Sequence, residues 1–247
     1  MLKRVALKSM IVNSLFLFAF FYFSSACSAV PYGETLCKKP GYNCLKIKPE
    51  DSWVQLFPNE QQRDLVKRVN RMNVFLKPDM VIAVPQALAK VTLMDVAPFA
   101  QQIKAPGEKK IEVNLAAMAW AAYGSDGHLV KWGPAASGTA FCPDFKEGCT
   151  TPIGVFRVLR KQGAACISSA LPQRLNGSKG GAAMPYCMHF YKGYTFHGSD
   201  ELTGRATSHG CVNLFENDAQ WLNEQFADTA QKGRKGTLVV IQKGAVL

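Results

Sequence analysis

The first structured part of the chain, residues 40–86, mixes helical and strand patterns. Asp51 can cap a short helix that begins at Ser52. A second helix is predicted over residues 60–70, where apolar residues recur at helical spacing; its core residues should be Leu65, Val66 and Val69. A turn follows, and residues 80–84 read as a short apolar strand that Pro85 ends. The predicted order, strand, helix, helix, strand, describes a small α+β unit.

From residue 110 onward the pattern changes to the two-residue alternation of β-strands. Ile111, Val113 and Leu115 alternate with polar residues. Turn residues between apolar runs predict two hairpins and further single strands. In the first hairpin, strands 119–123 and 128–132 flank the turn Ser125-Asp126-Gly127, and in the second, strands 186–191 and 194–196 flank the turn Lys192-Gly193. The single strands are expected over residues 153–159 and 238–241.

Only residues 216–226 of this part have a convincing helical pattern, with Ala219, Leu222 and Phe226 on one side. Many short strands with few helices predict a mostly β fold. We expect a compact β-sheet domain, sandwich-like or barrel-like, over residues 111–242, with one or two helices. Residues 87–110 lack strong periodicity and are expected to link this domain to the small unit.

Residues 1–29 have the three regions of a secretory signal peptide. Lys3, Arg4 and Lys8 give a positive start, residues 10–23 are largely apolar, and the following residues are small. The apolar run is shorter than the roughly 20 residues of a membrane-spanning helix. We therefore expect export to the periplasm or cell envelope, with membrane attachment only if the signal stays uncleaved or Cys27 is lipidated.

The formal net charge is +11, which favours an anionic partner. Lysine and arginine do not cluster with aromatic residues as they do on a nucleic-acid-binding face. For an exported chain we expect an anionic polymer of the envelope as the partner, and no nucleic acid.

Eight cysteines are present, and one of them, Cys27, belongs to the signal or its cleavage site. An oxidising compartment favours pairing of the others. If Cys211 stays free, the six candidates for disulfides are Cys37, Cys44, Cys142, Cys149, Cys166 and Cys187. The first two pairs can close small loops and the third follows by elimination, but six cysteines permit fifteen connectivities and the pairing stays open. A free thiol in such a compartment indicates reactivity.

Candidate chemistry gathers in Phe196-His197-Gly198-Ser199 and in Ser208-His209-Gly210-Cys211-Val212-Asn213. A thiol attacks as the thiolate, and a neighbouring imidazole commonly generates it near neutral pH. Glycine beside each group lets backbone approach the reacting centre closely, where N–H groups can stabilise an oxyanion. The pattern therefore indicates a cysteine nucleophile with a histidine base.

These motifs resemble the L,D-transpeptidase catalytic family, whose signature is His-Gly, a loop, and Ser/Thr-His-Gly-Cys followed by a hydrophobic residue and Asn or Arg. The resemblance covers roughly residues 111–242 and includes Thr151-Pro152-Ile153-Gly154-Val155-Phe156, the stretch from Gly133 to Gly138, and Met184-Pro185-Tyr186. The loop between His197 and Ser208 is shorter than in many members. The resemblance implies an enzyme of cell-wall biogenesis and cell shape that acts on peptidoglycan stem peptides without a cofactor or metal.

The resemblance also implies a role for each residue of the motifs. Cys211 forms a thioester with the stem peptide, and His197 carries the proton. The remaining implied roles are the carbonyl of Gly198 as partner of the imidazole, N–H groups of Gly210 and Cys211 as oxyanion donors, His209 shaping the cleft, Ser208 and Asn213 positioning groups, and Tyr186 and Tyr194 lining the cleft.

The small unit, residues 40–86, resembles a lysin motif, a carbohydrate-binding module of cell-wall enzymes. The resemblance is carried by Lys48-Pro49-Glu50-Asp51-Ser52-Trp53, by Asn70 or Asn73, and by the stretch from Lys77 to Pro85. Glu50 stands where the family normally has glycine. The resemblance implies binding of glycan strands; the alternative is a capped helical hairpin that only packs on the main domain.

Three other interpretations remain open. His197, His209 and Cys211 could bind zinc, although no fourth ligand follows at regular spacing. The chain could be a non-catalytic wall-binding protein, an interpretation that a disulfide at Cys211 would favour. The acyl-enzyme could also pass its acyl group to water, to a second stem or to a lysine of an envelope protein, giving carboxypeptidase, cross-linking or anchoring activity.

Overall fold

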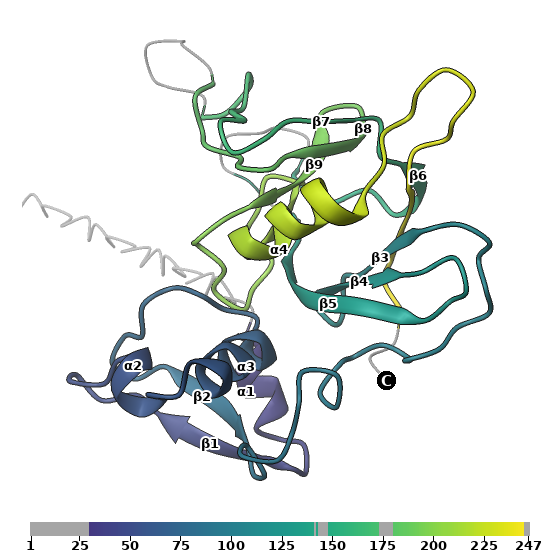
Figure 1. Ribbon diagram of the computed structural model, residues 1–247. Coiled ribbons are helices and arrows are strands. Elements are labelled where there is room, and N and C mark those ends of the chain that lie inside the picture. The colour runs from purple at the N-terminus through teal and green to yellow at the C-terminus, as the bar shows by residue number, and fades with distance from the viewer. Residues whose placement is uncertain (1–29, 141, 143–147, 173–179, 245–247) are drawn as a thin grey trace, which may run out of the picture.

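The computed structural model describes residues 30–140, 142, 148–172 and 180–244 of the chain. The expected signal peptide, Cys27 included, lies outside these residues. A small α+β unit packs beside a larger, curled β-sheet domain (Figure 1). Within the described ranges, no helix has the length and apolar character needed to cross a membrane.

The N-terminal unit has the predicted order of elements. Strand β1 (Tyr42–Lys46), helices α2 (Trp53–Leu56) and α3 (Glu60–Asn70), and strand β2 (Val81–Pro85) follow one another along the chain. β1 and β2 pair antiparallel. Helix α3 has the predicted bounds and buries the three predicted residues, Leu65, Val66 and Val69. A further short helix, α1 (Tyr32–Leu36), precedes β1 and packs against α3 and β2.

Helix α2 begins one residue later than expected, because Ser52 and not Asp51 is its cap. The backbone of Ser52 is extended, and its Oγ accepts a hydrogen bond from the Gln55 N–H at 3.3 Å. The Asp51 carboxylate instead accepts from the Lys48 N–H at 2.8 Å. Both residue types can cap a helix, and the residue with extended backbone at the helix start takes the role.

The main domain is built on one sheet in the order β6-β11-β3-β4-β5-β10-β9-β8-β7. Its strands are β3 (Lys110–Asn114), β4 (Ala119–Tyr123), β5 (Leu129–Ala136), β6 (Gly154–Arg157), β7 (Arg160–Lys161), β8 (Met188–Tyr191), β9 (Tyr194–Gly198), β10 (Val212–Leu214) and β11 (Leu238–Gln242). Both predicted hairpins, β4–β5 and β8–β9, are present. The mostly β prediction is confirmed.

The sheet curls until its ends meet around one core. The Phe156 ring of β6 lies 5.5 Å from the Phe190 ring and 5.1 Å from the Tyr191 ring of β8. Helix α4 (Glu216–Trp221) continues into a π-helical turn, Leu222–Phe226, and lies within the curl (Figure 1). The predicted side chains Ala219, Leu222 and Phe226 are buried there, among side chains of seven strands.

The expected linker, residues 87–110, packs against the sheet domain. Its Phe99 is buried against the β4–β5 hairpin. The carbonyl of Leu93 accepts a hydrogen bond from Trp132 Nε1 at 2.7 Å, and that of Ala100 accepts from the Tyr123 hydroxyl at 2.9 Å. Residues between β2 and β3 therefore run along the sheet domain and fasten to it.

Three disulfides join the described cysteines in the pairing that sequence spacing suggested: Cys37–Cys44, Cys142–Cys149 and Cys166–Cys187. Cys211 is free. The seventh described cysteine is therefore the unpaired one, as expected for a reactive thiol.

Asn70 ties α3 to β2, and its loss should destabilise the fold. Its amide donates to the carbonyls of Val66 and Ala83 at 2.8 and 2.7 Å and accepts from the Ala83 N–H at 2.8 Å. Asn70→Ala should lower the free energy of unfolding by about 1–3 kcal/mol, because buried polar groups lose their partners. Denaturant unfolding measures this loss. Asn43→Ala, at an exposed site on β1, is the control, and equal losses in both variants would contradict the prediction.

Candidate active site

Strands β9 and β10 bring the two motifs together. They pair in parallel, with Phe196 opposite Val212 and His197 opposite Asn213. Phe196 and Val212 are fully buried in the core. Because side chains alternate along a strand, His197 and Asn213 face the other side of the sheet. Cys211 directly precedes β10, and continuing the alternation places it on the His197 face, level with Thr195.

His197 is held as a neutral imidazole in one tautomer. Its ring is 9% exposed. Burial lowers the pKa of His197 below 6.5, and the hydrogen bond to Gly198 opposes that shift. Nδ1 lies 2.9 Å from the Gly198 carbonyl oxygen. A carbonyl can only accept, so Nδ1 carries the hydrogen and Nε2 is left as a proton acceptor. The predicted role of Gly198 in orienting the imidazole fits this contact.

Cys211 is half-buried and forms no disulfide. Burial raises the pKa of Cys211 above 9.0, while a backbone hydrogen bond from Thr195 works against the rise. The two shifts together favour a thiol and a neutral imidazole over a thiolate and an imidazolium. A thiol in this state reacts as a nucleophile only when it loses its proton, and a neutral imidazole is a group that can accept it.

The turn before Cys211 is fixed by Ser208. Its Oγ accepts a hydrogen bond from the Gly210 N–H at 3.1 Å and donates one to the Cys211 carbonyl. Gly210 has φ of 108°, and a Cβ there would lie 2.6 Å from Cε1 of Tyr194. Only glycine fits this position, with Tyr194 as the wall behind it. Ser208 thus shapes the turn, and the Gly210 N–H is engaged within it.

Thr151 also holds this turn, a role that sequence reasoning did not assign. Its hydroxyl accepts from the Gly138 N–H and donates to the Gly210 carbonyl, both at 2.9 Å. A Cβ on Gly138 would lie 1.7 Å from the Cys149 carbonyl oxygen. The available signal was the Thr-Pro-Ile-Gly motif, which marks this threonine without showing its partners. Gly138, just after β5, and the backbone of Cys149 therefore lie directly against the turn.

The other predicted site residues occupy different surroundings. Asn213 lies beside His197, and its Oδ1 is buried without a hydrogen-bond partner among the described residues. His209 is exposed. Tyr186 is half-buried and packs against the core. Across the described ranges, no group of three or more His, Cys, Asp or Glu side chains is arranged to hold a metal ion.

Comparisons with known proteins agree with this geometry. A family model for the L,D-transpeptidase catalytic domain matches residues 108–241. An L,D-transpeptidase from Xylanimonas cellulosilytica is similar in structure at 24% identity and a TM-score of 0.51, covering 74% of this chain and 79% of that chain. One from Mycobacterium smegmatis has 19% identity and a TM-score of 0.41, covering 55% of this chain and 58% of that chain.

The search of curated proteins gives no match. Sequence identity to the Xylanimonas structure is low, so that likeness establishes the fold alone. The family model, which spans more than half of the chain, carries the family assignment.

Alkylation of Cys211 should depend on His197. In the folded protein iodoacetamide should label Cys211 without prior reduction, with a rate that rises as pH passes upward through the pKa of His197, below 6.5. In His197→Ala the rate should rise only as the thiol itself ionises, above 9.0. Mass spectrometry measures the rates, and His128→Ala, at an exposed histidine, is the control. Identical profiles for the wild type and His197→Ala would show that His197 is not the base.

Proposed function

Because the chain belongs to the L,D-transpeptidase catalytic domain family, whose members act on the peptidoglycan of the cell envelope, we propose that Cys211 forms a thioester with a stem peptide and transfers it to an amine. The observation that carries the proposal is the free thiol on the face of His197, in a structure whose other described cysteines are all bridged. From the pattern of residues 1–29 we further propose that the protein is exported.

The first half-reaction needs one proton carrier. His197 Nε2 takes the thiol proton while sulfur attacks the carbonyl of the third residue of a tetrapeptide stem. The C–N bond to the terminal D-alanine breaks, and the imidazolium returns the proton to the leaving amine. The Gly198 carbonyl, which binds Nδ1–H, stabilises the imidazolium between these steps. In the second half-reaction an amine attacks the thioester and His197 accepts its proton. The C–S bond breaks, and the imidazolium returns the proton to the sulfur of Cys211.

The oxyanion of each tetrahedral intermediate requires backbone donors near Cys211. We assign the Cys211 N–H as the first donor. The Gly210 N–H already binds Ser208 Oγ, so it reaches the oxyanion only by sharing or leaving that partner. The unpaired Oδ1 of Asn213 suits an N–H group of the stem peptide, because a buried carbonyl without a partner is costly.

The acceptor distinguishes three activities of the same acyl-enzyme. An amine of a second stem gives a cross-link, a lysine of an envelope protein gives anchoring, and water gives L,D-carboxypeptidase activity. We propose an amine acceptor. The alternative of a non-catalytic wall-binding protein is disfavoured by the free state of Cys211.

Substitution of the nucleophile tests the proposal. Cys211→Ala should abolish turnover of a tetrapeptide donor, because no thioester can form. His197→Ala should slow turnover by about 10²–10⁴-fold, the range for a general acid–base group. Mass spectrometry of the muropeptides formed measures both losses and identifies the acceptor. His128→Ala, at an exposed histidine outside the two motifs, is the control. Turnover that persists in Cys211→Ala would end the assignment.

We propose glycan binding for the N-terminal unit, residues 40–86. The observed β1-α2-α3-β2 order with antiparallel pairing supports the lysin-motif likeness. Phe75 and Val54 are 89% and 63% exposed. The Trp53 indole donates to the Val74 carbonyl at 2.8 Å, which brings their segments side by side. Exposed apolar side chains of this kind provide a surface for sugar rings.

Phe75→Ser should weaken co-sedimentation with insoluble peptidoglycan and leave turnover of a small soluble tetrapeptide unchanged. The physical reason is that the side chain supplies contact area for the polymer and lies outside the catalytic motifs. Val130→Ser, at an exposed position of β5, is the matched control for loss of an apolar surface residue. Equal pelleting of wild type, Phe75→Ser and the control would remove this surface from the proposal.

A further inference from the structure

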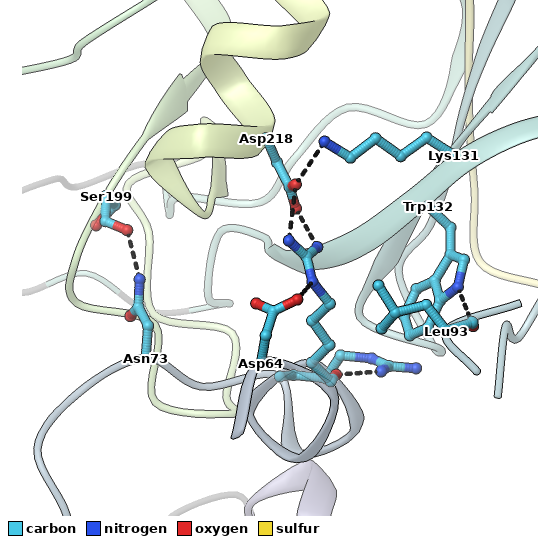
Figure 2. A network of polar contacts seen from close by, with 9 residues as sticks. Asp64, Asn73, Leu93, Lys131, Trp132, Ser199 and Asp218 are labelled. Carbon is cyan, nitrogen blue, oxygen red and sulfur yellow. Dashed lines mark hydrogen bonds and ion pairs between the residues drawn. The ribbon is translucent and has the colours of Figure 1, made fainter. Parts of the chain in front are cut away.

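The N-terminal unit holds the segment that joins the two catalytic motifs. The amide of Asn73 donates to the Ser199 carbonyl at 2.8 Å and accepts from the Leu202 N–H at 2.9 Å. The Asn73 N–H donates to the Leu202 carbonyl at 3.0 Å. These bonds span residues 199–202, which directly follow His197 and Gly198. Figure 2 shows Asn73 reaching Ser199 across the boundary between the unit and the sheet domain.

The contact continues along the segment as a short stretch of backbone pairing. Met72 and Thr203 form an antiparallel bridge. The Gly204 N–H donates to the Arg71 carbonyl at 3.0 Å, and the Gly204 carbonyl accepts from the Tyr32 N–H at 2.8 Å. Residues 199–204 therefore pair with the chain that leaves α3, much as an added strand pairs with a sheet edge.

The other side of the segment rests on the catalytic domain. The Ser199 N–H donates to the Leu214 carbonyl of β10 at 2.8 Å. Leu202 is 1% exposed and packs with Ala136 and Phe215. The Ser208 N–H then donates to the Ser137 carbonyl at 3.0 Å. The segment is thus held by the N-terminal unit along residues 199–204 and by the catalytic domain at Ser199, Leu202 and Ser208.

A buried ion pair anchors the unit at this place. Arg68 of α3 binds both carboxylate oxygens of Asp218, at 2.6 and 3.1 Å. Asp218 is 0% exposed and also lies 3.3 Å from Lys131. It belongs to α4, whose first residue, Glu216, comes within 3.0 Å of where a Cβ on Gly198 would be. Figure 2 shows Lys131 and Asp64 converging on the same network.

Undocking the unit would break both hydrogen bonds between Arg68 and Asp218 and leave Lys131 as the ion-pair partner of Asp218. The guanidinium of Arg71 also lies over the rings of Tyr32 and Trp132, at 4.5 and 5.0 Å, and so packs the two parts together. The unit is therefore fixed to the catalytic domain, in contrast to a module on a flexible tether.

We propose that the N-terminal unit sets the geometry of the catalytic pair, and that Asn73 is the positioning residue through which it acts. Asn73 touches no reacting atom; it fixes residues 199–202, which set how His197 meets the turn bearing Cys211. The proposal rests on the proposed roles of Cys211 and His197. It makes their geometry depend on the N-terminal unit, which lies outside the residues that the family model matches.

The test uses Asn73→Ala in the full mature chain. Removing the amide frees residues 199–204, so their backbone hydrogen exchange should accelerate, measured by mass spectrometry. Alkylation of Cys211 by iodoacetamide at neutral pH should slow by about 10- to 100-fold, since a small misplacement of a catalytic group has effects of that size. The kcat for a tetrapeptide donor should fall by a similar factor while KM stays unchanged. Asn73→Asp, which keeps the acceptor for the Leu202 N–H, should recover part of each loss.

Asn59→Ala is the matched control. Asn59 caps α3 in the same unit, where its side chain accepts from the Gln62 N–H at 3.0 Å, so this hydrogen bond does not involve residues 199–204. Its loss weakens the unit without releasing the segment, so alkylation and kcat should stay at wild-type values. Equal slowing in Asn59→Ala and Asn73→Ala would overturn the proposal, because stability of the unit alone would then explain the effect.

Two further outcomes separate this proposal from the proposed function. Unchanged exchange and alkylation in Asn73→Ala would overturn the positioning role even if the enzyme turns over stem peptides. Changed exchange and alkylation in a protein that never turns over stem peptides would support positioning and contradict the function. If Asn73→Ala does not fold, the same readings on Asn73→Asp decide the matter, with wild-type rates counting against the proposal.

Discussion

The parallel pairing of β9 and β10 is the constraint on which the site depends. Two neighbouring strands that run the same way cannot be joined by a tight turn, so the chain must leave one and return to the start of the other. Residues 199–211 make that return, and they carry the Ser208–Cys211 turn. The crossover therefore does two things at once. It gives the register that puts His197 and Cys211 on one face, and it exposes a long segment that other parts of the protein must hold.

Two sets of contacts hold that segment, and both lie far away in sequence. Thr151 and Gly138 support the end near Cys211 from the sheet domain, through the Gly210 carbonyl and close backbone contact. Asn73 and its neighbours support the end near His197 from the N-terminal unit. The buried Arg68–Asp218 pair fixes the unit in place. A buried ion pair adds little net free energy of folding, but separating its two partners is unfavourable. The pair therefore favours one docking arrangement of the unit.

Local signals predicted most of the elements. Helix α3 and the hairpins β4–β5 and β8–β9 follow from periodicity and turn residues that lie within each element. The cap of α2 was assigned one residue early, because Asp51 and Ser52 are both good caps and only backbone conformation separates them. The π-helical turn after α4 was not foreseen, since its apolar spacing still resembles an α-helix. The segment between β2 and β3 has no periodicity because it packs along a hairpin instead of forming an element of its own.

By itself, the sequence predicted the candidate chemistry. His197 and Cys211 with their glycines, and an odd cysteine beside six that pair, are readable because reactivity depends on residue type and short spacing. Tertiary structure decided everything that depends on partners distant in the chain. These include the effect of burial on the pKa values of His197 and Cys211, which favours the neutral form of both, the engagement of the Gly210 N–H by Ser208, and the support by Thr151 and Asn73. The lysin-motif likeness points to Asn70 or Asn73 but not to this role of Asn73, because the role comes from residues 199–202, which only folding brings beside it.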